Sequence, residues 1–385
     1  MESLQVPRPA WMTEDLVLLE EQARRFLGTE LVPQVEKWTE DGIMERSGWD
    51  KLGAAGLLCA GIPEEYGGAG GTFAHETVIN REFALAGLDS IGAPLHSGIV
   101  APYILNYGTE EQKKKWLPRL ATGELIGAIA MSEPGTGSDL QGVRATAKKS
   151  GNGYVLNGSK TFITNGDMAD LVIVAARTTP EKGAKGITLF VVEEGMEGFA
   201  RGRKLDKVGQ TESGTSELFF EDLFVGDGNV LGELDRGFIH MMERLAQERI
   251  GAAVSNIAHA TQILDETIEY VKQRKAFGQS VGSFQYNKFL IAELVTKAEV
   301  TQSYVDNAIV AHDEDRLSAV DAAKTKWWSA HVQNEILDAC VQLHGGYGYM
   351  NEYRVARAWR DARVTKIWAG SNEIMKELIG RDLGL

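Results

Sequence analysis

The sequence predicts an α+β protein, mainly α, with three parts: an N-terminal helical domain, a middle antiparallel β-sheet or barrel domain, and a C-terminal four-helix bundle. Apolar residues recur at helical spacing in the first and last thirds of the chain. Between them, short apolar runs alternate with clusters of Gly, Asp and Lys, a pattern typical of strands and turns. We therefore place the domains at 1–124, 125–236 and 237–385.

The N-terminal third shows helix signals of the usual kind. Thr13 is a candidate N-cap, with acidic residues in the turn that follows, and Pro33 should kink or end the first helix. Residues 1–12, with Pro7 and Pro9, are expected to form a loose lead-in. Further helices are predicted at 49–58, 72–88, 93–107 and 109–120, the last capped by Thr109.

The middle third changes to short apolar segments. Strands are predicted at 125–131, 171–176, 187–192 and 218–225. Residues 154–156 and 160–164 are predicted to form a hairpin around an Asn157–Gly158 turn. The basic cluster Arg201–Lys204 is interpreted as a solvated loop.

The helical period returns at Gly237 and continues to the end of the chain. The lengths of the apolar runs suit a bundle of four helices followed by a short one. These helices are predicted at 237–274, 284–312, 317–343, 352–366 and 372–380.

Composition excludes several classes of protein. The 385 residues carry a net charge of −14, which argues against a nucleic-acid partner. No apolar run approaches the roughly 18 residues of a membrane span. Two cysteines, Cys59 and Cys340, fit a reducing compartment. Because residues 1–12 lack a signal pattern, we expect a cytoplasmic protein, or a mitochondrial-matrix one if a presequence was removed.

Common cofactor and metal motifs are missing from the sequence. No G-x-G-x-x-G follows a predicted strand, and no G-x-S-x-G is present. His75–Glu76 lacks the second His of a zinc helix, and the seven His are scattered, so no metal is expected. These absences favour an organic cofactor bound in another way.

Glu248 occupies an unusual position on the first predicted bundle helix. It falls on an apolar stripe, where a carboxylate is costly unless it is paired or protonated. One interpretation pairs it with Arg244 or Arg249 at a wet helix edge. The other makes it a general base in a dry pocket. The stripe comprises Phe238, Met241, Leu245, Ala252 and Ser255.

Four Gly-rich stretches could bind a ligand, although each also has a structural explanation. Met131–Asp139 offers hydroxyls and open backbone N–H groups, but could be a surface turn. Phe162–Gly166 carries an aromatic face, but could be a core Phe beside a turn. Arg274, with Phe277 and Gln285, could clamp a pyrophosphate or simply pair with a Glu. The fourth stretch combines residues 342–346, at a helix end, with residues 371–373, at a helix start, and helix capping would equally explain both.

Taken together, these motifs closely resemble those of the acyl-CoA dehydrogenase family of flavoproteins. The segments that carry the resemblance are SEPGTGSD, KTFITNG, RKAFG, QLHGGYGY and IWAGSNEIMKELIGRDL, so it spans essentially the whole chain. HSGIV, QERI and VKQRKAFG are most similar to its long-chain branch.

The resemblance implies noncovalent FAD and identifies candidate contacts. Phe162 stands where many members have Trp, which keeps an aromatic platform. One group of contacts would face the flavin of a neighbouring subunit, which implies a homotetramer; it comprises Arg274, Phe277, Gln285, Gln342, Leu343, His344, Gly345 and Gly346. The others are Ile129, Met131, Ser132, Thr136, Gly137, Ser138, Phe162, Ile163, Thr164, Ser371, Asn372 and Glu373.

The catalytic carboxylate departs from the pattern of many members. Their Tyr-Glu-Gly-Thr stretch is matched here by Trp368–Ser371, so Ala369 replaces the Glu. In the long-chain and isovaleryl branches the base lies instead in a Glu-Arg pair, matched by Glu248–Arg249. Ala369 would keep a backbone N–H for the developing oxyanion. Burial should raise the pKa of Glu248 toward the operating pH.

The substrate side follows from the same resemblance. Ser138, Ala246, Gln247, Arg249, Ala369 and Gly370 match positions near the acyl-CoA. His96, Ser97 and Val100 are our expectation for part of the acyl-tail lining.

The sequence therefore predicts an FAD-dependent enzyme that converts medium-chain, long-chain or branched acyl-CoA to trans-2-enoyl-CoA. Glu248 would remove the α-proton, flavin N5 would accept the β-hydride, and electrons would pass to an electron-transfer flavoprotein. The alternatives are an isovaleryl-like or terpenoid acyl-CoA dehydrogenase, an acyl-CoA oxidase, and a non-catalytic partner subunit.

Overall fold

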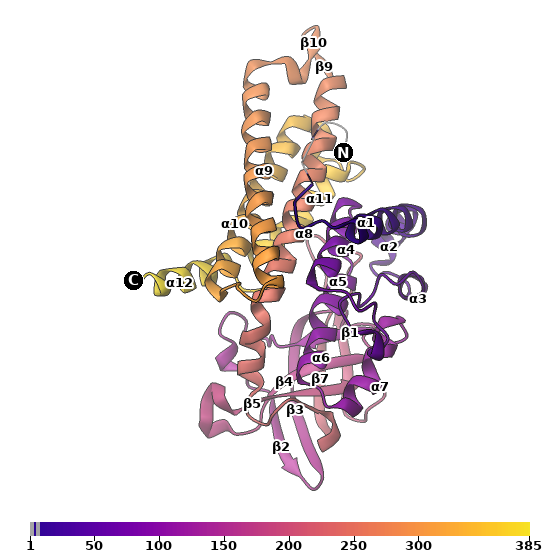
Figure 1. Cartoon of the computed structure of the whole chain (residues 1–385), viewed down its shortest axis with the longest axis vertical. Coiled ribbons are helices and arrows are strands. Elements are labelled where there is room, and N and C mark those ends of the chain that lie inside the picture. Colours follow the sequence, from indigo (N-terminus) through magenta and orange to yellow (C-terminus); the bar gives the residue numbers. More distant parts are fainter. Residues whose placement is uncertain (1–3, 5–7) are drawn as a thin grey trace.

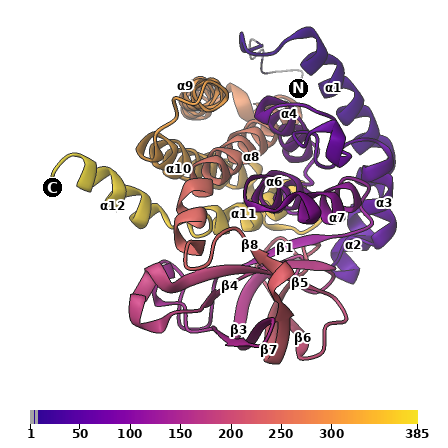
Figure 2. The same cartoon turned by 60° about the horizontal axis from the view of Figure 1, so that its bottom comes forward.

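The computed structural model describes residue 4 and residues 8–385 (Figure 1). The rest of the expected lead-in, including Pro7, lies outside the described residues. The molecule is elongated, with the sheet at one end and the tip of the helical bundle at the other (Figure 1). The N-terminal helices lie against both the bundle and the sheet (Figure 2).

The N-terminal region is helical, as predicted. Helix α1 (Glu14–Phe26) continues into a π-helical turn, Leu27–Leu31, and a 3₁₀ turn that contains Pro33, so the predicted kink is present. A second π-helical turn, His96–Val100, joins two helices within the range predicted at 93–107. The other helices are α2 (Val35–Asp41), α3 (Arg46–Ala54), α4 (Phe73–Leu85), α5 (Ala93–Leu95), α6 (Ala101–Tyr107) and α7 (Glu110–Ala121).

Helix α7 begins with a capping box. The Thr109 hydroxyl accepts a hydrogen bond from the Gln112 backbone N–H, and the Gln112 side chain accepts one from the Thr109 N–H. We expect Thr109→Ala to lower the free energy of unfolding by about 1 kcal/mol, because one N-terminal N–H loses its partner. Urea unfolding followed by circular dichroism would measure this loss; an unchanged midpoint would contradict it.

The middle region is an eight-stranded, mainly antiparallel sheet. Its strand order is β6-β7-β3-β2-β4-β5-β8, and β1 pairs with β4. A purely antiparallel sheet was predicted, but the β1–β4 and β2–β4 pairings are parallel. The strands are β1 (Gly127–Ala130), β2 (Thr146–Ser150), β3 (Gly153–Thr164), β4 (Leu171–Arg177), β5 (Ile187–Glu193), β6 (Phe199–Lys204), β7 (Thr215–Gly226) and β8 (Val230–Leu231).

The predicted hairpin turn at Asn157–Gly158 is wrong. Both residues lie inside β3, where the pairing with β7 shifts register between Leu156 and Gly158. Gly158 has φ 151°, and a Cβ there would come within 2.7 Å of the Ala145 Cβ. The Asn-Gly pair therefore marks a bulge that lets another chain segment approach. The actual hairpin connects β2 to β3.

The interpretation of Arg201–Lys204 as a loop is also wrong. This segment belongs to β6, an edge strand paired with β7. Its basic side chains therefore lie at the edge of the sheet, and charged side chains are common on edge strands. The Arg201 guanidinium pairs with Glu194 at 2.6 Å and donates to the Ala169 carbonyl.

The C-terminal region forms the predicted bundle. Helix α12 projects away from the body and carries the C-terminus (Figure 1). The apolar core of the bundle is separate from the core shared by the sheet and helices α6 and α7. The helices are α8 (Gly237–Gln273), α9 (Gln285–Asp313), α10 (Ala319–His344), α11 (Arg354–Ala362) and α12 (Asn372–Asp382), with a small hairpin, β9 (Lys275–Ala276) and β10 (Gln279–Ser280), before α9.

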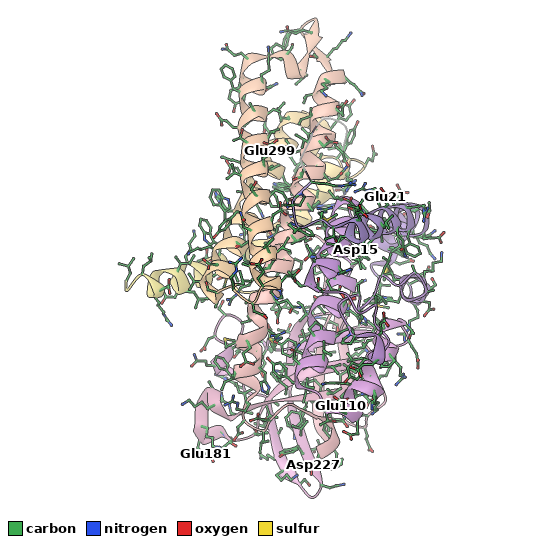
Figure 3. All side chains as sticks on the ribbon, in the orientation of Figure 1. Asp15, Glu21, Glu110, Glu181, Asp227 and Glu299 are labelled. Atoms are coloured by element: carbon green, nitrogen blue, oxygen red, sulfur yellow. The ribbon has the colours of Figure 1, made fainter. Side chains whose placement is uncertain are left out.

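The excess negative charge is spread over the surface. Figure 3 labels six exposed carboxylates, which lie on the N-terminal helices, in the middle region and on α9. Cys59 and Cys340 are buried free thiols. Among the residues that the structure describes, we find no helix long and apolar enough to cross a membrane.

Candidate active site

Glu248 lies on α8 at the boundary between the bundle and the N-terminal helices. The fully buried face of this helix contains Ile250, Val254 and Ile257, whereas Glu248 is half-buried beside that face. The stripe predicted from the sequence is therefore offset from the core, and most of it is half-buried. Glu248 borders the core rather than standing inside it.

The carboxylate of Glu248 is held by a tyrosine. The Tyr103 hydroxyl, from α6, donates a hydrogen bond of 3.2 Å to Oε1. No ion pair joins Glu248 to Arg244 or Arg249 in the described part of the chain, so the paired-residue interpretation is wrong. Burial raises the pKa of Glu248 to about 7, although the Tyr103 hydrogen bond and the two arginine charges oppose the rise. A carboxyl group with this pKa suits proton transfer near neutral pH.

The loop that carries Ala369 lies close to the same helix. Ala369 has φ 51° and Gly370 has φ 87°, so a non-glycine residue occupies the left-handed region. The Lys326 ammonium, from α10, donates to the Gly370 carbonyl at 2.6 Å. A Cβ placed on Gly370 would lie 4.0 Å from Nη2 of Arg249. The structure therefore brings the Glu248–Arg249 turn and the Ala369 loop together, as the resemblance implies.

Arg249 is only 6% exposed, and no salt bridge to it is found among the residues that the structure describes. Burial lowers the pKa of its guanidinium, and the Glu248 charge partly offsets this. Its Nε has no hydrogen-bond partner among the described residues. Buried polar groups nearly always have a partner, so an unpaired guanidinium N–H indicates a place for a polar ligand group.

The Met131–Asp139 loop is fixed by an ion pair that the sequence analysis missed. The ammonium of Lys160 lies 2.9 Å from the carboxylate of Glu133, and both side chains are buried. Lys160 also donates to the Met131 carbonyl. The loop itself leaves Gly137 and Ser138 exposed, as a ligand-binding loop requires.

Phe162 combines exposure with backbone strain. Its side chain is 71% exposed, yet its φ is 59°, in the left-handed region that a Phe rarely adopts. It lies where the pairing of β3 with β7 is interrupted between Lys160 and Ile163, and Ile163 is buried beneath. Strained residues persist where surrounding structure holds them for function. An exposed aromatic side chain at the end of a rigid strand fits a platform for a flat ring.

A second cluster of predicted contacts lies near the tip of the bundle. A cavity of about 600 Å³ is lined by Arg274 and residues 342–346, so this part of the third and fourth ligand-binding stretches comes together; Phe277, Gln285 and residues 371–373 are not part of its lining. The Arg274 guanidinium lies 5.3 Å from the ring centroid of Tyr347, and in the described chain no salt bridge to a Glu is found for it. Phe277, in the β9–β10 hairpin, is 95% exposed.

The two clusters are far apart within one chain. Glu248 lies on α8 and Arg274 directly follows its last residue, so the two are separated by about 40 Å at about 1.5 Å per residue. Figure 1 shows the sheet and the β9–β10 hairpin at opposite ends of the molecule. Phe162 belongs to the sheet and Arg274 directly precedes the β9–β10 hairpin, so the two side chains lie in separate regions of the chain.

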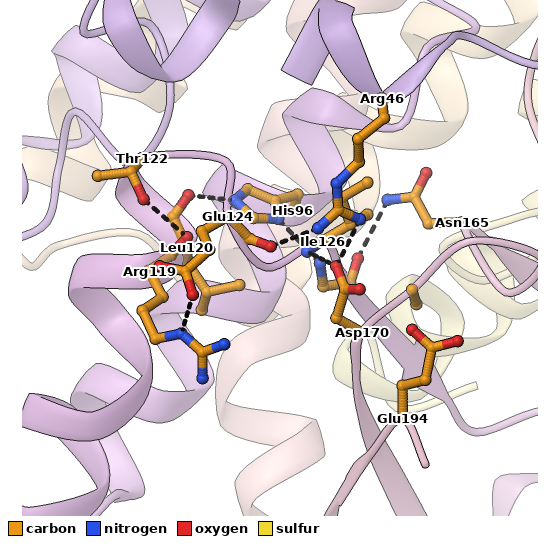
Figure 4. Close-up of polar contacts among 12 residues, drawn as sticks. Arg46, His96, Arg119, Leu120, Thr122, Glu124, Ile126, Asn165, Asp170 and Glu194 are labelled. Carbon is orange, nitrogen blue, oxygen red and sulfur yellow. Dashed lines mark hydrogen bonds and ion pairs between the residues drawn. The ribbon is translucent and has the colours of Figure 1, made fainter. Parts of the chain in front are cut away.

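The residues expected to line the acyl tail, His96, Ser97 and Val100, are all buried. His96 is fully buried; its Nδ1 accepts from the Gly127 N–H, and its Nε2 donates to the Leu120 carbonyl. Figure 4 shows His96 enclosed between these segments. Ser97 accepts from the Cys59 N–H, and Val100 packs in the core. His96 thus joins the N-terminal helices to strand β1, and Ser97 joins its own helical turn to the Cys59 backbone.

Two other residues matched to the substrate side do line a cavity. Ala246 and Gln247 border a space of about 160 Å³ together with Arg244. The Gln247 amide also donates to the Gly98 carbonyl at 3.0 Å. Sequence reasoning missed Tyr103 and Lys326, because no local pattern marks a partner more than 40 residues away.

Family models match almost the whole chain. Residues 13–124 match the acyl-CoA dehydrogenase N-terminal domain, residues 128–223 the middle domain and residues 235–384 the C-terminal domain. These three matches follow the helix–sheet–helix order of the structure.

Individual relatives agree. The chain is 47% identical to the mouse mitochondrial long-chain specific acyl-CoA dehydrogenase over 95% of this chain and 86% of that protein. It is 37% identical to an isovaleryl-CoA dehydrogenase of Pongo abelii, over 96% and 89%. The crystal structure of an acyl-CoA dehydrogenase from Geobacillus kaustophilus superposes with a TM-score of 0.96 at 45% identity, covering 98% of this chain and 100% of that one.

A structural neighbour also bears on the cofactor. A glutaryl-CoA dehydrogenase of Mycobacterium smegmatis, solved in complex with FADH2, has a TM-score of 0.89 at 27% identity, with 96% and 95% coverage. The exposed Phe162 and the unpaired N–H of Arg249 fit such a cofactor and its substrate. The chain belongs to the acyl-CoA dehydrogenase family, and it is an FAD-dependent oxidoreductase that dehydrogenates acyl-CoA.

Proposed function

We propose that the protein converts medium-chain, long-chain or branched acyl-CoA to trans-2-enoyl-CoA with Glu248 as the catalytic base. One observation carries this assignment: Glu248 is a half-buried carboxylate with a pKa raised to about 7, next to a loop where Ala369 offers no carboxylate. The Trp368–Ser371 loop itself contains no side chain that can serve as a base near neutral pH.

The chemistry divides between side chain and backbone. The α-proton of a thioester is a very weak acid, so its removal needs a base and a donor for the developing enolate oxygen. Glu248 supplies the base, and the Ala369 backbone N–H supplies a donor that does not depend on the side chain. FAD, when bound, accepts the hydride from Cβ. The guanidinium of Arg249 binds or orients a polar group of the acyl-CoA.

The cofactor site is proposed to form between subunits of a homotetramer. Residues 129–138 and 162–164 of one chain would hold the flavin, and Ser371, Asn372 and Glu373 would complete that side. Arg274, Phe277, Gln285 and residues 342–346 would come from a partner. The separation of about 40 Å along α8 supports this arrangement. So do the exposed apolar side chains of α9, which include Tyr286, Phe289 and Val300.

We further propose an electron-transfer flavoprotein as acceptor. A similar chain, 36% identical with a TM-score of 0.93, comes from a structure described as the electron transferring flavoprotein of Acidaminococcus fermentans. The buried free thiols Cys59 and Cys340 support a reducing compartment, either the cytoplasm or the mitochondrial matrix.

Anaerobic titration of the purified protein with a panel of acyl-CoAs tests the substrate class. The panel contains butyryl-, octanoyl-, dodecanoyl-, palmitoyl- and isovaleryl-CoA, and absorbance of the flavin reports reduction. We expect the fastest bleaching with octanoyl-CoA or longer chains, because the long-chain relative shares more identity than the isovaleryl one. Fastest bleaching by isovaleryl-CoA would replace this assignment with the branched-chain alternative.

The same preparation tests the remaining alternatives. A colourless protein that binds no added FAD would indicate a non-catalytic partner subunit. Rapid reoxidation of the bleached flavin by air would indicate an oxidase. A yellow protein that bleaches and reoxidises slowly agrees with the proposal.

A further inference from the structure

We propose that Tyr103 is a positioning residue for the base: its hydroxyl anchors Oε1 of Glu248, stabilises the carboxylate form and leaves Oε2 to take the proton. The inference rests on the proposed role of Glu248. It concerns a side chain of the N-terminal helices, outside every motif of the bundle and the sheet that suggested the function.

The position of Tyr103 is rigid. Its side chain is fully buried in the core shared by the sheet and helices α6 and α7. It lies in α6, directly after the π-helical turn His96–Val100, and such turns reorient the side chains that follow them. A hydroxyl held this way loses little conformational freedom when it donates a hydrogen bond.

A neighbouring contact fixes the distance between the two helices. The Gln247 amide donates to the Gly98 carbonyl at 3.0 Å, and the next residue, Glu248, accepts from Tyr103 at 3.2 Å. Two consecutive residues of α8 are therefore bonded to the helical segment 96–107. These two hydrogen bonds together fix the position of the Glu248 carboxylate relative to the helical segment 96–107.

The hydroxyl acts as a donor at every pH of interest. Burial and the Glu248 charge raise the pKa of Tyr103 well above its usual value, so the phenol stays protonated. The hydrogen bond can then only favour the ionised form of Glu248. It thereby opposes burial, which favours the neutral acid.

The other charges around Glu248 come from different directions. Arg244 and Arg249, on α8 itself, lower the pKa of Glu248 through their charge alone, without a hydrogen bond. From α10, Lys326 is near Arg249 but is bonded to the Gly370 carbonyl. The charge of Glu373, at the start of α12, acts on Lys326. Tyr103 is thus the one described side chain that bonds directly to the carboxylate.

The test is the pH dependence of flavin reduction by a saturating acyl-CoA in the Tyr103→Phe holoenzyme. Loss of a hydrogen bond to a charged group should raise the pKa that governs reduction by about one unit. Reduction below that pKa should slow about tenfold and recover at alkaline pH. KM should change little, because Tyr103 is buried behind the base. Recovery at high pH is a result that a purely structural defect would not produce.

Tyr107→Phe is the matched control. Tyr107 lies one turn further along α6, with ring centroids 6.0 Å apart, and its hydroxyl lies 2.7 Å from the Glu243 carboxylate, to which it donates, and 3.2 Å from the His240 carbonyl. This variant should keep the wild-type pH profile. A Tyr103→Phe profile that coincides with the wild type, or a loss equal at every pH, would overturn the inference.

Further variants separate the two hypotheses. If Glu248→Gln still reduces its flavin, the proposed base is wrong; if it is inactive while Tyr103→Phe leaves the profile unchanged, only the role of Tyr103 fails. Should Tyr103→Phe not retain flavin, the pair Tyr103→Gln and Tyr103→Leu applies the same test. Only the Gln side chain offers a hydrogen-bond donor, so the pKa that governs flavin reduction should be lower in Tyr103→Gln than in Tyr103→Leu. Equal pKa values in the two variants would overturn the inference.

Discussion

Glu248→Gln is expected to keep the flavin but to lose bleaching by acyl-CoA. The amide has nearly the same shape and can still accept from Tyr103, so cofactor binding should not change. It cannot accept the α-proton, and a general base contributes roughly 10²–10⁴-fold to a rate. We therefore expect reduction of the flavin to slow by about 10²–10⁴-fold in anaerobic stopped-flow measurements.

The wild-type pH profile gives a second measure of the same residue. The base must be ionised to act, and burial raises its pKa to about 7. Reduction should accordingly fall as pH drops through 7 and reach a plateau above it. Glu248→Gln should show a low rate with no such transition.

Glu243→Gln is the control for this substitution. Glu243 lies on the same helix, is exposed, and also accepts a hydrogen bond from a tyrosine, Tyr107. Its replacement should leave the reduction rate within about twofold, since a surface substitution usually has a small effect. Reduction by Glu248→Gln at a rate near that of the control would show that another group is the base.

Lys160→Met should have the largest effect on stability. The Lys160–Glu133 pair is buried on both sides, so removing the ammonium leaves a carboxylate without its counter-charge. Breaking a buried pair in this way costs about 3–5 kcal/mol of unfolding free energy. The Met131–Asp139 loop, which Glu133 holds through the Arg144 and Ala145 N–H groups, should lose order at the same time.

Urea unfolding and flavin content measure these two consequences. Lys148→Met, on the exposed face of the neighbouring strand β2, should change stability by less than about 0.5 kcal/mol. Adding Glu133→Gln to Lys160→Met should restore part of the loss, because the unpaired charge is removed. Equal stability of Lys160→Met and Lys148→Met would mean that the buried pair does not support the loop.

Much of the architecture could be predicted because it depends on local sequence. Helix periodicity and N-caps such as Thr109 act within one or two turns, and the observed helices begin and end close to the predicted residues. The errors have the opposite character. Gly158 lies in a bulge only because Ala145, from another segment, packs against it. Arg201–Lys204 becomes a strand only because β7 provides a partner.

The candidate site divides in the same way. Sequence alone identified Glu248 as an unexplained carboxylate, Ala369 as a position without one, and the Gly-rich motifs of the family. Only the tertiary structure decided that no arginine among the described residues forms an ion pair with Glu248, that Tyr103 donates a hydrogen bond to it, and that Arg274 lies beside residues 342–346. These facts depend on how helices and strands distant in sequence pack together, and periodicity and spacing contain no information about such contacts.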